Sequence, residues 1–122
     1  MTAYFDENET QSTEERLTHQ GRKMRRMLQE GSNKSKRLKV ILDETGVNPD
    51  TFQFPADMAK LPVISREKLV EWELAEPPYG GLDDPDAEID RIFISPGPVY
   101  EPHLSEDDPL WARAYKAAGV QK

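Results

Sequence analysis

The chain has 122 residues, a formal net charge of −7 and no cysteine, and 32% of its residues are charged against 36% hydrophobic. This length allows one domain at most, the absence of cysteine excludes disulfides and thiolate chemistry, and no apolar run approaches the ~20 residues that a bilayer requires. We therefore expect a soluble, cytoplasmic chain with no membrane partner and with few residues for a core.

The chain is expected to begin with a disordered N-terminus, residues 1–11, because this segment is polar and acidic. Ser12 and Glu15 then have the spacing of a capping box, which predicts a helix that begins there and ends at Gly31. Its basic residues are typical either of a solvated helix face or of a nucleic-acid surface. The acidic balance of the whole chain favours the solvated face, so we expect no nucleic-acid partner.

A second helix is expected from about Lys34 to Thr45, with Gly46 as its stop and a turn after it. Ser65 is expected to cap a third helix, from Arg66 to about Leu74. These helices define a helical N-terminal region, residues 12–76. The predicted inward-facing residues of this region are Leu17, Met24, Met27, Leu28, Leu38, Ile41, Leu42, Phe52, Phe54, Met58, Leu61, Leu69 and Trp72.

Residues 77–122 are expected to supply a loop, a strand and a helix that open an α/β core. Ile92 and Ile94 alternate with their neighbours, which predicts one strand that leads into a Ser/Gly/Pro loop. A final helix follows, capped by Asp107 or Asp108. Its expected packing surface is Trp111, Ala114, Tyr115 and Ala118, and its expected stop is Gly119. A lone strand leaves its edges unpaired, so we expect another part to complete the sheet.

Several short stretches of the sequence stand out, and they follow one another in a characteristic order along this chain. They are LDETGVNPD (Leu42–Asp50), DMAKLPVISREKL (Asp57–Leu69), PPYGGL (Pro77–Leu82), IFISPGP (Ile92–Pro98) and AAGV (Ala117–Val120), after a basic helix. Together they resemble the N-terminal region of the phenylacetate–CoA ligase family, within the AMP-forming adenylate-forming enzymes. The resemblance covers about residues 15–122, and the collinear order carries it rather than any single motif.

This resemblance implies a fold class as well as a function. The fold would be α/β, with an N-terminal helical region followed by one strand-loop-helix unit of an incomplete adenylate-forming-enzyme fold. The family activates carboxylic acids with ATP, CoA and Mg, and its members continue for several hundred residues. By resemblance, this chain is an N-terminal piece or small subunit whose partner is a larger polypeptide with the rest of the fold. None of ATP, CoA and Mg is expected to bind this chain alone.

In the family, the strand feeds a loop that wraps the phosphates of ATP and ends in Lys-Pro. The corresponding residues here are SPGPVYEP (Ser95–Pro102), where Glu101 stands in place of the lysine and the threonines are absent. The resemblance assigns phosphate or substrate contact to Ser95 and Gly97, and an ordinary turn is the alternative. Tyr100 is expected either to line a substrate or partner surface or to pack. No catalytic residue and no metal ligand are expected.

Three hypotheses remain open at this point. The first is a part of an acyl- or aryl-CoA ligase, in which Leu17, Met24, Leu38, Ile41, Trp72 and Trp111 become fully buried only with a larger chain. The second is a non-catalytic binding or regulatory subunit derived from such a ligase. The third is an independent small α+β protein. His103 fits either an acid–base role near neutral pH or a solvated loop, and no partnered acid is evident for it in the sequence.

Overall fold

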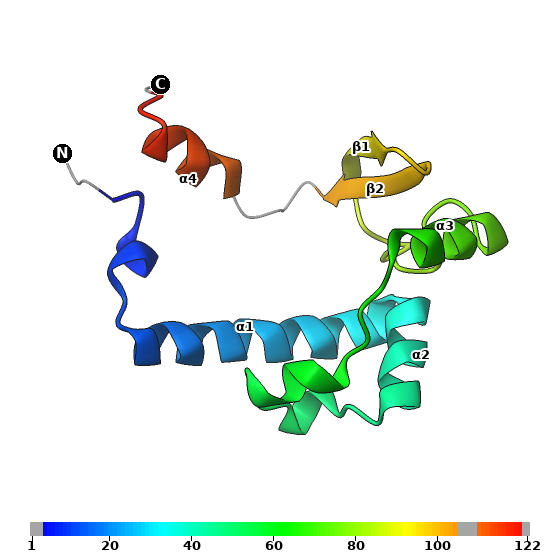
Figure 1. Ribbon diagram of the computed structural model, residues 1–122, viewed down its shortest axis with the longest axis horizontal. Coiled ribbons are helices and arrows are strands. Elements are labelled where there is room, and N and C mark those ends of the chain that lie inside the picture. Colours follow the sequence, from blue (N-terminus) through cyan, green and yellow to red (C-terminus); the bar gives the residue numbers. More distant parts are fainter. Residues whose placement is uncertain (1–3, 105–109, 121–122) are drawn as a thin grey trace.

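The computed structural model describes residues 4–104 and 110–120. Over these residues the chain is a mixed α/β protein with four α-helices and one two-stranded antiparallel sheet (Figure 1). The α-helices are α1 (Thr13–Lys34), α2 (Lys36–Thr45), α3 (Arg66–Ala75) and α4 (Leu110–Ala117). The strands are β1 (Ile89–Ser95) and β2 (Val99–Leu104), and short 3₁₀ helices are η1 (Glu7–Thr10), η2 (Pro49–Thr51) and η3 (Ala56–Lys60). No helix of this part of the chain is long and apolar enough to cross a bilayer.

Helix α1 begins where its capping box predicts. The Ser12 hydroxyl accepts the N–H of Glu15 at 3.2 Å, and the Glu15 carboxylate accepts the N–H of Ser12 at 2.8 Å. The hydrogen bonds that the N–H and the hydroxyl of Ser12 donate to this carboxylate lower the pKa of Glu15. The predicted stop at Gly31 is wrong, because the helix continues to Lys34. Gly31 instead permits close packing, since a Cβ there would lie 2.6 Å from Cδ2 of Leu38.

One residue, Ser35, separates α1 from α2 and caps both helices. Its N–H donates to the carbonyl of Gly31 at 2.7 Å and closes α1, while its hydroxyl accepts the N–H of Leu38 at 3.2 Å and opens α2. Helix α2 ends at Gly46 as predicted, in a left-handed conformation with φ of 66° that an L side chain would strain. This geometry lets the N–H of Val47 reach the carbonyl of Leu42.

The main core lies between α1, α2 and the segment that contains η2. It consists of Leu28, Leu42, Val47 and Phe52, with Met24, Leu38, Phe54 and Leu61 partly buried around it. Phe52 is 1% exposed, and the backbone carbonyl of this residue accepts a hydrogen bond from Arg25. The expectation that Ile41 needs a larger chain for its burial is wrong, because Ile41 is already buried by its own chain.

Contacts of Ser35 and Arg37 join the α1–α2 junction to the loop that follows α3, and we call this set of contacts the latch. The Ser35 hydroxyl and the N–H of Arg37 both donate to the carbonyl of Gly81, at 3.1 and 2.8 Å. The Arg37 side chain donates to the carbonyl of Gly80 at 3.0 Å, and its guanidinium lies 4.8 Å from the ring centroid of Trp72. These contacts fix α3 and the sheet relative to the first two helices.

The sheet differs from the predicted single strand. Residues 99–104, which the sequence assigned to a loop, form β2 and pair with β1 in an antiparallel hairpin, with Ile94 opposite Tyr100 and Phe93 opposite Glu101. The turn at Pro96, Gly97 and Pro98 reverses the chain direction, so a second strand stands between the first strand and the last helix. The expected strand-loop-helix unit is therefore corrected to a hairpin followed by a helix.

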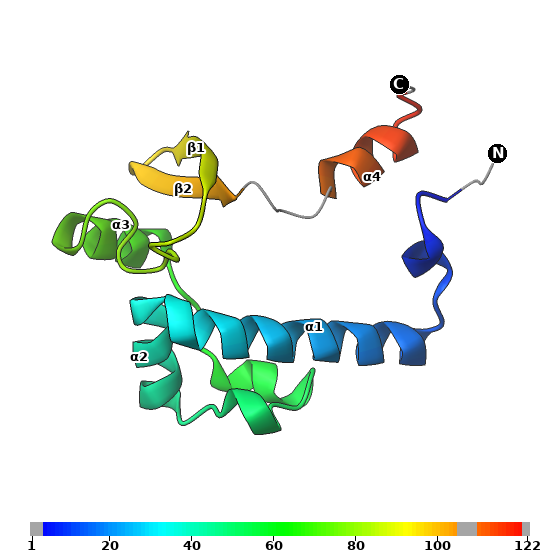
Figure 2. The ribbon, with the colours of Figure 1, turned by 180° about the vertical axis from the view of Figure 1, so that it is seen from behind.

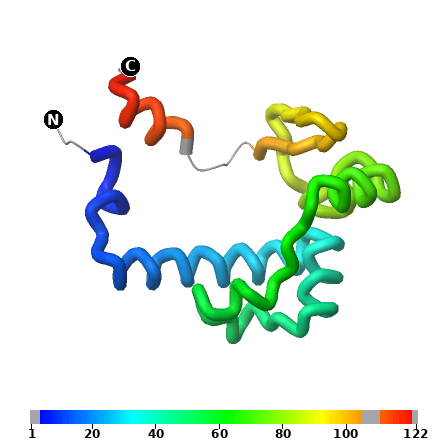
Figure 3. Tube along the Cα trace, in the orientation of Figure 1, coloured from blue at the N-terminus to red at the C-terminus, as the bar shows by residue number. Residues whose placement is uncertain are grey.

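Helix α4 lies beside the N-terminal segment rather than on the core (Figures 2 and 3). Its Arg113 pairs with Asp6 and lies over the ring of Phe5, and Lys116 donates to the carbonyl of Tyr4. The surface expected to pack is exposed instead; it comprises Trp111, Ala114, Tyr115 and Ala118. Gly119 follows the helix with φ of 80°, as expected, and the expected caps Asp107 and Asp108 lie outside the described residues.

A pair of glycines in α1 tests the close packing of Gly31. Gly21→Ala should stabilise the chain by about 0.5–1 kcal/mol, because alanine favours a helix and its Cβ would meet Phe54 at an ordinary 3.4 Å. Gly31→Ala should lack this gain, because the side chain of Leu38 would have to shift to make room for the new Cβ. Urea unfolding midpoints measure both, and an equal gain at the two positions would contradict the packing role of Gly31.

The latch predicts that Arg37→Lys is destabilising although the charge is kept. The lysine loses the planar group that reaches Gly80 and lies over Trp72, so we expect a loss of about 1–2 kcal/mol in the free energy of unfolding. Lys36→Ala is the matched control, since Lys36 pairs with Glu76 on the surface and such pairs contribute less than about 1 kcal/mol. Equal effects of the two substitutions would argue against the latch.

Candidate functional site

The candidate site residues lie at the turn end of the hairpin, where it meets α3. Ser95 ends β1 opposite Val99, Gly97 lies in the turn, and Tyr100 is the second residue of β2. The turn packs on α3, since a Cβ on Gly97 would lie 3.1 Å from Cγ2 of Val70. The carbonyl of Pro96 accepts a hydrogen bond from Arg66, at the first turn of α3. Gly97 and Tyr100 face the same pocket, whereas Ser95 does not line it.

Sequence reasoning missed the most unusual residue of this site, Glu73 on α3. Glu73 is only 7% exposed. Both of its carboxylate oxygens accept the N–H of Tyr100, at 3.0 and 3.2 Å. A signal was present in the sequence, because Glu73 stands three and four positions after Val70 and Leu69 and so shares their helix face. An acid on an apolar face is a candidate for function.

Glu73 lines two pockets. The first has a volume of about 350 Å³ and is mostly apolar; its lining is Val70, Glu73, Leu74, Pro77, Pro78, Gly97, Pro98 and Tyr100. The second has a volume of about 240 Å³ and is lined by Leu69, Glu73, Tyr79, Leu82, Asp83, Val99, Tyr100, Glu101 and Pro102. Neither lining contains a lysine or an arginine, so the charged side chains that line these two pockets are all acidic.

These residues do not fit the phosphates of ATP. Phosphate binding requires free N–H donors and a cation, but Pro96 and Pro98 have no N–H and that of Tyr100 is directed at Glu73. The nearby Arg66 is committed to the carbonyl of Pro96. A triphosphate at this turn would also meet the carboxylate of Glu73, which repels it.

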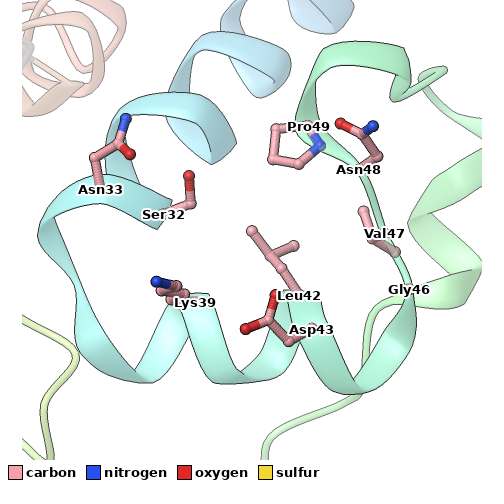
Figure 4. Close-up of a pocket in the computed structure, with 9 residues that line it drawn as sticks. All are labelled: Ser32, Asn33, Lys39, Leu42, Asp43, Gly46, Val47, Asn48 and Pro49. Carbon is pink, nitrogen blue, oxygen red and sulfur yellow. The ribbon is translucent and has the colours of Figure 1, made fainter.

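A larger pocket lies elsewhere, at the α1–α2 junction, and has a volume of about 520 Å³ (Figure 4). Ser32 and Asn33 from α1 face Lys39, Leu42 and Asp43 from α2 across it. The side chains of Ser32 and Asn33 both donate to the carbonyl of Gln29 and are therefore already used. The pocket thus offers an open polar surface without a convergent set of ligand-binding groups.

His103 lies on strand β2 rather than in a loop, and it has the acidic partner that the sequence did not reveal. Its Nδ1 lies 2.7 Å from a carboxylate oxygen of Asp90, and its ring meets Phe93 edge-on with centroids 6.0 Å apart. The hydrogen bond from His103, with smaller help from Arg91, lowers the pKa of Asp90. His103 lines none of the pockets described above, so the pair is best explained as a cross-strand contact.

The acidic turn before the hairpin is held by hydrogen bonds and an ion pair. Asp84 pairs with Lys34 at 2.9 Å and accepts the N–H of Asp86, and these contacts lower the pKa of Asp84. Within residues 4–104 and 110–120, no three acidic or histidine side chains gather where they would hold a metal ion.

Comparison with models of known protein families and with curated proteins gives no match for this chain. The resemblance to the phenylacetate–CoA ligase family therefore rests on the residues quoted above.

The Asp90–His103 contact predicts an acid-sensitive hairpin. Because the folded-state pKa of Asp90 lies below its ordinary value of 3.8, its stabilising contribution is complete above that value and is lost as the pH falls through the folded-state pKa. Asp90→Asn should therefore reduce the loss of stability between pH 5 and about pH 2. Urea midpoints across this range test it, and parallel profiles for the two proteins would rule out a contribution from Asp90.

Proposed function

We propose that this chain is the N-terminal part, or a small subunit, of a phenylacetate- or aryl-CoA ligase-like AMP-forming enzyme. In this proposal the chain supplies structure to a larger polypeptide and activates no acid alone. ATP, CoA and Mg would bind only where the rest of the fold is present. The collinear resemblance over about residues 15–122 supports the ligase class.

The observation that carries the proposal is the incomplete sheet. The N–H of Tyr100 in β2 donates to Glu73, so α3 lies along the outer edge of β2. Strand β1 pairs only with β2 among the described residues, and its outer edge therefore has no strand beside it. Such an edge favours addition of a further strand.

The face of the hairpin supports the same proposal. Ile92 and Ile94 alternate onto one face, opposite Pro102 and Tyr100 of β2, and Ile92 and Ile94 are 51% and 66% exposed. A two-stranded hairpin with such a face is marginal by itself, because further strands or a covering helix normally bury it. A larger chain that adds a strand beside β1 and packs against Ile92 and Ile94 would cover both this edge and this face.

The alternative is a non-catalytic binding or regulatory subunit derived from such a ligase. It is favoured by the turn at Gly97, where Pro96 and Pro98 have no N–H for phosphate and the pocket beside it holds the carboxylate of Glu73. Both versions require a partner, and they differ in whether the completed assembly activates an acid with ATP and CoA.

The proposal predicts that one exposed apolar residue matters for assembly and another does not. Ile94→Glu should abolish co-purification of the untagged chain with a larger polypeptide from its own cells, because it places a charge on the surface to be covered. Val63→Glu is the matched control, since Val63 is 99% exposed and lies outside the hairpin. Native mass spectrometry of the isolated material measures both.

The proposal is contradicted if the wild-type chain is monomeric and cooperatively folded and does not bind a co-expressed larger polypeptide. If the complex forms, assays of ATP- and CoA-dependent acid activation on the pair distinguish the ligase part from the non-catalytic subunit.

A further inference from the structure

Glu73 presents a buried carboxylate to the pocket between α3 and the hairpin turn. It makes no ion pair with a lysine, arginine or histidine among the described residues, and a single N–H, that of Tyr100, serves both of its oxygens. A carboxylate presents about four lone-pair positions, and a buried one is costly unless it is paired and fully hydrogen-bonded. The arrangement therefore leaves unused acceptor capacity at the wall of the 350 Å³ pocket.

The remaining walls of this pocket define what else a ligand must carry. Val70, Leu74, Pro77, Pro78 and Pro98 are apolar, and Tyr100 adds an aromatic ring. The volume of about 350 Å³ is at the small end of the range for ligand pockets. An apolar body of a few carbon atoms would be buried by these walls, and a cationic end would meet Glu73.

The charges around the pocket reinforce this selection. The adjoining pocket adds Asp83 and Glu101 near the same carboxylate, and neither lining contains a basic residue. An anion of the same shape would be repelled by these groups, whereas a cation is attracted by all of them.

We propose that the pocket between α3 and the hairpin turn binds a small organic cation, namely an ammonium group on an apolar stem, with Glu73 as its counter-ion. The ligand displaces solvent from the carboxylate, donates to the lone pairs that Tyr100 leaves unused and packs its stem against the prolines. This proposal concerns a site within one chain, and its test needs no larger polypeptide.

Titration of the full chain with 2-phenylethylammonium, followed through the amide resonance of Tyr100, tests the proposal. Saturable binding is expected, with 2-phenylethanol at least about tenfold weaker, because it lacks the charge that pairs with Glu73. Phenylacetate should not bind. A parallel titration with Nα-acetyl-lysine amide distinguishes a free amine from a protein side chain as the source of the ammonium group, and tighter binding of either one supports the shared chemistry.

Two variants connect the binding to Glu73. Glu73→Gln keeps an acceptor for the N–H of Tyr100 and should weaken binding of the cation about tenfold or more, since it removes the charge. Glu71→Gln is the matched control, because Glu71 lies on the same helix, is exposed and pairs with Lys68. It changes the net charge equally and should leave binding intact.

A further variant serves if Glu73→Gln fails to fold. Leu74 lines the pocket but is 77% exposed, so Leu74→Arg places a tethered guanidinium beside Glu73 without loss of core packing. It should raise the melting temperature and weaken binding of the free cation about tenfold or more. The proposal is overturned if 2-phenylethylammonium does not bind, if the alcohol binds equally well, or if binding is unchanged in both Glu73→Gln and Leu74→Arg.

Discussion

The rest of the structure depends on two backbone carbonyls, those of Gly80 and Gly81. They receive Ser35 and Arg37 from the α1–α2 junction, and this is where the helical part of the chain holds α3 and the hairpin. Both glycines have positive φ, and a Cβ on Gly80 would lie 2.8 Å from the Cβ of Trp72. No other residue type would let the loop approach α3 so closely and still aim its carbonyls at α2. The hairpin, Glu73 and the pocket beside it all owe their position to this contact.

The helical half could be predicted because its signals are local. The capping box at Ser12, the cap at Ser65 and the left-handed Gly46 each act within a few residues, so the sequence alone specifies where α1 and α3 begin and where α2 ends. The predicted helix end at Gly31 was wrong because the role of this glycine is not local. It provides room for the side chain of Leu38, which arrives from the next helix, and no pattern within α1 reveals that.

The hairpin half could not be predicted to the same extent. Pro96, Gly97 and Pro98 indicate a turn equally well before a helix or a strand, and Pro102 argues against a strand unless an edge is involved. The carboxylate of Glu73 is brought to Tyr100 only when β2 forms, 27 positions along the chain. The candidate site predicted at Ser95, Gly97 and Tyr100 was therefore near the pocket, but its chemistry is set by an acid from another element. Whether it serves a ligase remains a proposal.

The shared cap at Ser35 has a consequence for how this chain tolerates change. One residue terminates α1 and starts α2, so no loop separates the two helices. The rotation of α2 about its own axis is therefore fixed relative to α1. Each residue advances a helix by about 100°. A single insertion at this point would therefore turn α2 about its axis and move Arg37 away from Gly80, whereas an insertion in the loop at residues 83–88 would leave that rotation untouched. Insertions and deletions should thus be tolerated in the loop before the hairpin and not between α1 and α2.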